Sequence, residues 1–117
     1  GTRHLVETAL EKGAQCLIHT SSVAAWGEVE GHIHEELPQE GDRSRINYNR
    51  TKWLGEREAL KGMDGGMKVV ITNPATVIGP YDATSWGHAF LMVQQDAFPF
   101  ALPGCASFAH AAEVAKA

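Results

Sequence analysis

The chain has 117 residues, of which 44% are hydrophobic and 21% are charged, so it can form one globular domain and lacks the composition of disordered or fibrous proteins. Ten Lys and Arg against 14 Asp and Glu give a net charge of −4, which excludes the broad basic surface that binds nucleic acid or anionic membranes. The longest apolar runs are far shorter than the roughly 20 residues of a membrane span. We therefore expect a soluble cytoplasmic domain in which Cys16 and Cys105 are free, buried thiols.

Helical and strand-like patterns alternate along the first half of the chain. Residues 2–12 repeat apolar side chains at helical spacing, and Gly13 is suited to end this helix. Residues 15–20 contain a short apolar run that predicts a strand covered on both faces. Residues 27–44 are polar and rich in acidic side chains, which indicates a long loop. Residues 46–61 are predicted to form a second, amphipathic helix.

The second half continues the alternation. Residues 68–72 are mostly β-branched and predict a buried strand, which an Asn-Pro pair ends because proline cannot donate to a sheet. A helix is expected over residues 85–96, a short strand near 107–108 and a last helix from about Ala111. Helices that alternate with buried strands predict an α/β fold with a parallel sheet. Because only two strands are convincing and the last pattern stops inside a helix, we expect one part of a longer protein.

Tyr48 and Lys52 stand four positions apart on the second predicted helix. This spacing puts both side chains on one helix face, so the phenol and the ammonium can converge on one ligand. A free tyrosine has a pKa of about 10, and a nearby cation favours its phenolate form. Such a pair suits proton transfer to or from a hydroxyl or carbonyl oxygen. The motif alone is weak, because the same spacing is more often found on a solvated helix face.

Hydroxyl side chains follow the first predicted strand. Thr20, Ser21 and Ser22 stand at its carboxyl end, where open α/β sheets bind ligands. A serine hydroxyl there can hydrogen-bond a substrate carbonyl and stabilise developing negative charge, although a simple turn is the alternative. A third segment, Asn-Pro-Ala-Thr-Val-Ile-Gly-Pro at residues 73–80, is expected to leave the second strand as an ordinary loop.

In this order, these segments resemble the extended short-chain dehydrogenase/reductase family. The resemblance rests on Thr-Ser-Ser-Val-Ala-Ala-Trp-Gly at residues 20–27, on Tyr-x-x-x-Lys and on residues 73–80. The first helix and the segment Phe-Ala-His-Ala-Ala-Glu-Val-Ala are also similar to family segments, although Ala111 and Glu113 depart from the family pattern. The resemblance covers essentially the whole chain and implies a Rossmann-type, doubly wound parallel sheet.

The resemblance also implies roles for individual residues. Tyr48 would be the general acid/base, and Lys52 would lower its pKa and bind the nicotinamide ribose of NAD or NADP. Ser22 would hold the substrate oxygen. Trp26 stands where relatives often carry an aromatic residue and would face substrate, with core filling as an equal alternative. The other cofactor-binding positions that the resemblance implies are Thr20, Ser21, Pro74, Ala75, Thr76 and Val77.

The family's Gly-x-x-Gly-x-x-Gly loop, which cradles the cofactor pyrophosphate, does not occur in this sequence. Residues 1–117 would therefore be the catalytic middle of an NAD(P)-binding domain, without the Gly-rich portion and most of the substrate-binding portion. A metal site is not expected, because His32 and His34 lie in a polar loop and the other histidines are scattered.

The expected function is that of an NAD(P)-dependent oxidoreductase acting on a carbonyl or secondary alcohol of a small molecule. Residues 73–80 favour a resemblance to the dihydroflavonol-reductase-like branch. The alternatives are a nucleotide-sugar epimerase or dehydratase, which would use the same tyrosine and lysine, and a non-catalytic binding member of the fold. The resemblance further implies a homodimer formed through helices 2–12 and 46–61.

Overall fold

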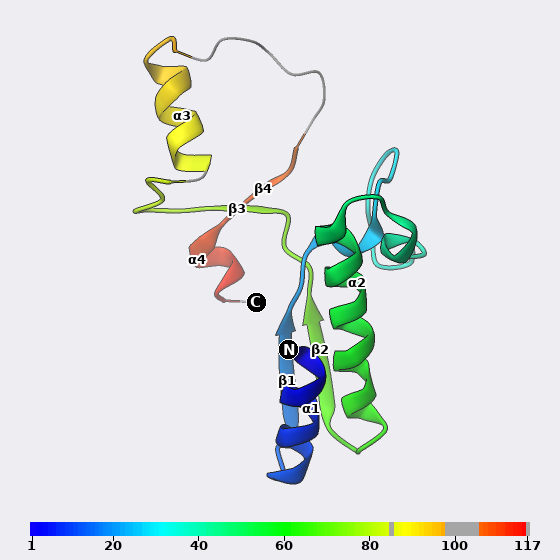
Figure 1. Ribbon diagram of the computed structural model, residues 1–117. Helices are drawn as coiled ribbons and strands as arrows, with labels where there is room; N and C mark the ends of the chain where they lie inside the picture. Colours follow the sequence, from blue (N-terminus) through cyan, green and yellow to red (C-terminus); the bar gives the residue numbers. More distant parts are fainter. Residues whose placement is uncertain (85, 98–105, 117) are drawn as a thin grey trace. The chain divides into compact units, whose positions relative to one another are not determined.

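The computed structural model describes residues 1–84, 86–97 and 106–116. The chain divides into two compact units, residues 1–73 and residues 74–117. Each unit contains a two-stranded parallel sheet with helices beside it (Figure 1). The predicted α/β class with parallel strands is thus confirmed. Within the described ranges, no helix is both long and apolar enough to cross a membrane.

The first unit is built from two helices and two strands. Helices α1 (Thr2–Glu11) and α2 (Asn47–Leu60) pack against each other, and α2 also packs against strands β1 (Cys16–Thr20) and β2 (Lys68–Thr72). The strands pair in register along all five residues of each. Gly13 follows α1 with a positive φ of 73°, as the helix-ending prediction requires. The buried apolar residues of this unit are Val6, Ala25, Trp26, Ala59 and Met67.

One face of the β1–β2 sheet is exposed in this chain. Ile18 is 69% exposed and Val70 is 39% exposed, and the Cys16 thiol is exposed as well. The expectations that the first strand is covered on both faces and that Cys16 is buried are therefore wrong for this chain. Successive strand residues point to opposite faces, and no described layer covers the side that carries these three residues. Cys105 lies outside the described residues.

Two short helical turns, one just before the predicted long loop and one near its end, were not identified from the sequence. The 3₁₀ helix η1 (Val23–Trp26) follows β1, and η2 (Gly41–Arg43) precedes α2. A side chain at Gly41 would collide with the backbone oxygen of Ala25 and would press on the Cβ atom of Trp53. Only glycine allows the end of the loop to pack this closely between η1 and α2.

The second unit contains β3 (Thr76–Ile78), α3 (Trp86–Gln94), β4 (Phe108–His110) and α4 (Ala111–Val114). Strand β3 pairs in parallel with β4. The prediction of an ordinary loop over residues 73–80 is wrong at these three positions. Three β-branched residues in a row, Thr76, Val77 and Ile78, favour a strand, and β4 is the strand with which they pair. The helix expected over 85–96 is confirmed as the slightly shorter α3; residue 85 lies outside the described residues.

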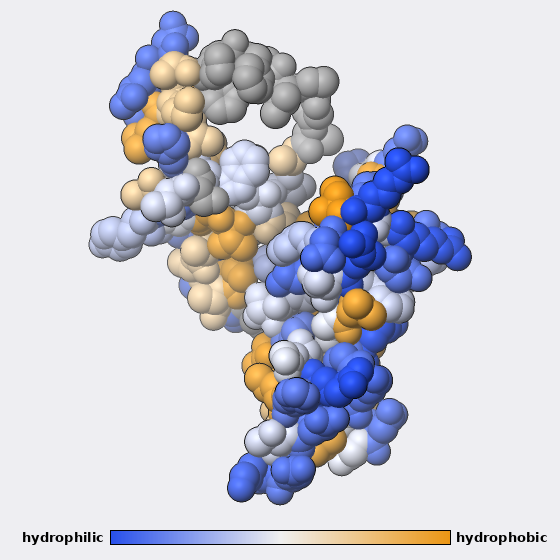
Figure 2. All heavy atoms as spheres, in the orientation of Figure 1, coloured by the Kyte–Doolittle hydropathy of each residue, from blue (hydrophilic) through white to orange (hydrophobic). Residues whose placement is uncertain are grey.

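On the face drawn in Figure 2, hydrophilic residues predominate over the first unit, with small hydrophobic areas among them. In the second unit, the ring of Phe108 contacts two aromatic side chains of α3. Its centroid lies 5.4 Å from that of Trp86 and 5.9 Å from that of Phe90. These edge-on and tilted contacts are favourable for aromatic rings and join α3 to β4.

Candidate active site

Tyr48 and Lys52 lie on one face of α2, as their spacing predicts. The Lys52 Nζ atom is 5.6 Å from the centroid of the Tyr48 ring, close enough for a cation–π attraction. Tyr48 is 54% exposed and Lys52 is half-buried. Lys52 forms no ion pair with any residue that the structure describes. The phenol and the ammonium are therefore both available to a ligand.

The hydroxyl residues after β1 have different surroundings. Thr20 is the last residue of β1 and is exposed. The backbone N–H of Ser21 donates to the Thr72 carbonyl at 2.8 Å, which continues the strand pairing past the end of β1. The Ser21 hydroxyl is buried, and no described residue forms a hydrogen bond with it. Buried hydroxyls are normally hydrogen-bonded, so this oxygen has capacity for a further partner at the carboxyl edge of the sheet.

Ser22 caps the start of η1. Its Oγ atom accepts a hydrogen bond from the Ala24 N–H at 3.2 Å, and its backbone is extended. Its carbonyl accepts from the Ala25 N–H at 3.0 Å and from Asn73 Nδ2 at 3.1 Å. Because capping uses a lone pair of Oγ and leaves the hydroxyl proton, Ser22 can still donate to a ligand oxygen.

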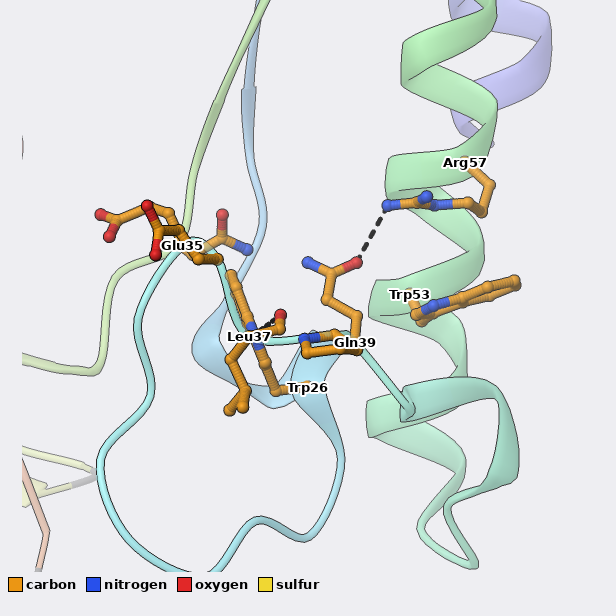
Figure 3. Close-up of a pocket in the computed structure, with 9 residues that line it drawn as sticks. Trp26, Glu35, Leu37, Gln39, Trp53 and Arg57 are labelled. Carbon is orange, nitrogen blue, oxygen red and sulfur yellow. Dashed lines mark hydrogen bonds between the residues drawn. The ribbon is translucent and has the colours of Figure 1, made fainter.

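Trp26 lies at the wall of a cavity of about 510 Å³ beside α2. Figure 3 shows its indole N–H directed to the Leu37 carbonyl, which accepts at 2.8 Å. Trp26 is 6% exposed, so its ring packs as part of the core of the first unit. The predicted contact of Trp26 with a substrate stays a prediction.

The second unit carries the remaining predicted cofactor contacts. Pro74 and Ala75 are half-buried residues that follow β2, and Thr76 and Val77 are the first two residues of β3. Thr76 donates its backbone N–H to the Ser107 carbonyl at 3.1 Å. The predicted contact of these four residues with the nicotinamide carboxamide stays a prediction.

His19 is a titratable residue near Lys52 and Glu56 that was not identified from the sequence. Burial lowers the pKa of His19 below its usual value, and the Lys52 ammonium lowers it further, whereas the Glu56 carboxylate acts in the opposite direction. A neutral His19 adds no positive charge beside Lys52. Among the described residues, no group of three His, Cys, Asp or Glu side chains is arranged to hold a metal ion.

Glu56 and Asn73 form a buried polar contact that the sequence analysis also missed. Asn73 Nδ2 donates to Glu56 Oε1 at 2.5 Å, and Glu56 is only 2% exposed. Glu56 follows Lys52 by four positions, so helical spacing could have placed it on the same face. Asn73 was identified only as the residue that ends the second strand.

Sequence comparisons identify the family to which the chain belongs. The profile described as "NAD dependent epimerase/dehydratase family" matches residues 1–97. A putative dihydroflavonol 4-reductase of Synechocystis sp. is 38% identical over 84 residues. Sterol demethylase protein B of Methylococcus capsulatus is 34% identical over 83 residues. Each alignment covers 70% of this chain but only 24% and 25% of these two relatives.

Solved structures share the fold. The crystal structure of gox2253 matches 98% of this chain with a TM-score of 0.85 and 29% identity, and the match covers 36% of gox2253. MoeE5, solved in complex with UDP-glucuronic acid and NAD, matches 98% of this chain with a TM-score of 0.79 and 23% identity, over 40% of its own chain. These matches confirm the predicted Rossmann-type fold, for a chain that spans well under half of either structure.

Proposed function

Because this chain belongs to the NAD-dependent epimerase/dehydratase family, we propose that it is the catalytic middle of an oxidoreductase acting on a carbonyl or secondary alcohol. The observation that carries the proposal is the Lys52 ammonium, which has no ion-pair partner among the described residues, beside the exposed phenol of Tyr48. Helix α2 carries both and packs against η1, which begins at the carboxyl end of β1. Ligands of open α/β sheets bind at this edge. We place the enzyme in the cytoplasm, where an exposed thiol such as Cys16 stays reduced.

The residues present fit the nicotinamide cofactor for which the family is described. The Lys52 ammonium can donate to the hydroxyls of a ribose, and the Ser21 hydroxyl is buried without a partner among the described residues. When bound, the cofactor supplies the exchange of a hydride. We assign its binding to Thr20, Ser21, Tyr48 and Lys52 and to residues 74–77.

The protein's own residues would then move the proton and stabilise charge. In the direction of reduction, the Tyr48 phenol donates its proton to the substrate oxygen; in the direction of oxidation, the phenolate removes a proton from the substrate hydroxyl. Lys52 stabilises the phenolate by its positive charge. Ser22 donates a hydrogen bond to the same substrate oxygen. The Ala24 N–H uses only a lone pair of Ser22 Oγ, so the hydroxyl proton is left for this donation.

A second candidate is a nucleotide-sugar epimerase or dehydratase, which would use the same tyrosine and lysine. The likeness to MoeE5, solved with UDP-glucuronic acid, favours this candidate, whereas the relative named as a reductase and residues 73–80 favour the first. The experiment is an assay of the complete enzyme with NAD(P)H and a panel of aldehydes and ketones. Consumption of NAD(P)H supports the proposal. Conversion of UDP-sugars without net change in NAD(P)H supports the second candidate, and no turnover of either class supports a binding role.

The 117-residue chain by itself is expected to show no measurable NAD(P)H binding in a fluorescence titration. The sequence has no Gly-x-x-Gly-x-x-Gly loop, and backbone amides at such a loop supply much of the recognition of the pyrophosphate. A chain carrying Lys52→Met serves as the matched control. If the unsubstituted chain binds NAD(P)H with a micromolar dissociation constant, the main phosphate contacts do not depend on a Gly-rich loop, and this expectation is wrong.

We also propose a homodimer formed through α1 and α2. Leu5 on α1 is 56% exposed and Leu54 on α2 is 54% exposed, so both helices carry apolar surface for a two-fold interface. Leu54→Glu is expected to shift the complete enzyme towards monomer in sedimentation experiments, because a carboxylate would be buried in the interface. Ile33→Glu, on the loop, is the control and should leave the dimer intact. If the Leu54→Glu variant is still a dimer at micromolar concentration, this proposal is wrong.

A further inference from the structure

Glu56 is the one ionisable side chain that is buried among the described residues. Its exposed fraction is 2%, and it lies on α2 one turn after Lys52 and two turns after Tyr48. A carboxylate removed from water is costly unless its oxygens accept hydrogen bonds. The role of Glu56 therefore depends on which groups donate hydrogen bonds to its carboxylate.

Both carboxylate oxygens of Glu56 have an amide partner. Asn73 Nδ2 donates to Oε1 at 2.5 Å, and Gln39 Nε2 donates to Oε2 at 2.7 Å. Gln39 is held in turn by Arg57, which donates to its Oε1 atom at 2.9 Å, as Figure 3 shows. Glu56 forms no ion pair with any described residue. Two hydrogen bonds from neutral amides therefore stabilise the buried carboxylate.

Asn73 connects Glu56 to the proposed catalytic serine. The same Nδ2 atom donates to the Ser22 carbonyl at 3.1 Å, so its two hydrogens have two different acceptors. Asn73 directly follows β2, and Ser22 directly follows the end of the β1 pairing at Ser21. The bridge therefore joins the carboxyl ends of both strands to the helix that carries Tyr48 and Lys52.

We propose that Glu56 is a positioning residue, which holds Ser22 in place relative to Tyr48 and Lys52 through Asn73. A carboxylate can only accept, so it requires the nitrogen of the Asn73 amide, and not the oxygen, to face it. That orientation supplies the hydrogen for the Ser22 carbonyl. A glutamine at position 56 can also donate, so Asn73 could rotate and release Ser22. The inference rests on the proposed function, since it concerns the same catalytic step.

The test is a double-mutant cycle in the complete enzyme, with kcat and KM measured for Glu56→Gln, Ser22→Ala and the double variant. We expect Glu56→Gln to lower kcat by up to about 10²-fold, the order of loss caused by a misplaced catalytic group. In the Ser22→Ala background the same change should add little, because the group that it positions is gone. Glu58→Gln, on the same helix but paired with Arg3 and Lys61, is the matched control and should keep normal kcat.

The outcomes separate this inference from the proposed function. If Ser22→Ala alone keeps normal kcat, the proposed role of Ser22 fails and the inference fails with it. If Ser22→Ala is impaired while Glu56→Gln is normal, or if the two losses multiply, only the inference is overturned. Should Glu56→Gln not fold, Asn73→Ala removes the bridge from its other end and takes its place in the cycle.

Hydrogen exchange gives a readout that does not depend on activity. The Ala24 N–H donates a hydrogen bond to the Ser22 side chain, and the Ala25 N–H donates one to the Ser22 carbonyl. The exchange rates of both amides therefore report on how firmly Ser22 is held. Their exchange should be faster in Glu56→Gln than in Glu58→Gln. Equal exchange in the two variants would overturn the inference.

Discussion

Replacement of Tyr48 by phenylalanine in the complete enzyme is expected to lower kcat by about 10²–10⁴-fold, the usual loss when a general acid/base is removed. The dissociation constant for NAD(P)H should stay nearly unchanged, because most of the proposed cofactor contacts come from other residues and the variant loses only the hydroxyl of Tyr48. Steady-state kinetics together with a fluorescence titration of the cofactor measure the two effects separately.

Tyr81→Phe is the matched control for this experiment. Tyr81 is the other tyrosine of the chain, its side chain is fully exposed, and it lies outside the proposed site, so the same chemical change there should leave kcat unaltered. Turnover close to wild type in Tyr48→Phe would show that another group exchanges the proton.

Lys52→Met is expected to weaken cofactor binding and to move the pH–rate profile of the complete enzyme to more alkaline pH. The ammonium lies 5.6 Å from the centroid of the Tyr48 ring, and its removal takes away the charge that favours the phenolate. The profile of kcat/KM and a cofactor titration are the measurements.

Lys61→Met controls for the loss of a positive charge from the same region. Lys61 follows the end of α2 and pairs with Glu58 at 2.7 Å, so its removal should alter neither the profile nor cofactor affinity. An active Lys52→Met variant with an unchanged profile would mean that Lys52 does not act on Tyr48.

Local pattern was sufficient to predict the two α-helices and the two strands of the first unit. The strand over 68–72 has the predicted bounds, and α1 and α2 differ from the predicted helices by one residue at their ends. Strand β3 was missed because three residues are too few for a periodic signal and its partner β4 lies far along the chain. The exposure of Ile18 could not be predicted from its apolar neighbours, because it depends on which layers are present above the sheet.

The site was predictable to the extent that one element carries it. Helical spacing placed Tyr48 and Lys52 on one face, and the family resemblance pointed to Ser22. The Glu56 contacts could not be predicted, because Gln39 comes from a polar loop and Asn73 from a strand end. From the sequence alone, a glutamate in a helix is expected to be an exposed charge. Only the fold shows that two amides contact Glu56.

The pairing of β1 with β2 makes the proposed site depend on a contact between distant segments of the chain. Cys16 pairs with Lys68, so the loop and α2 must be spanned before the first strand contact forms, and this closure is slow compared with growth of a helix. The bridge from Glu56 through Asn73 to Ser22 joins the same two distant segments. Helix α2 alone is sufficient to place Tyr48 and Lys52 one turn apart, but it does not position the serine. The proposed arrangement of all three side chains therefore requires the long-range pairing of the two strands in addition to the local helix.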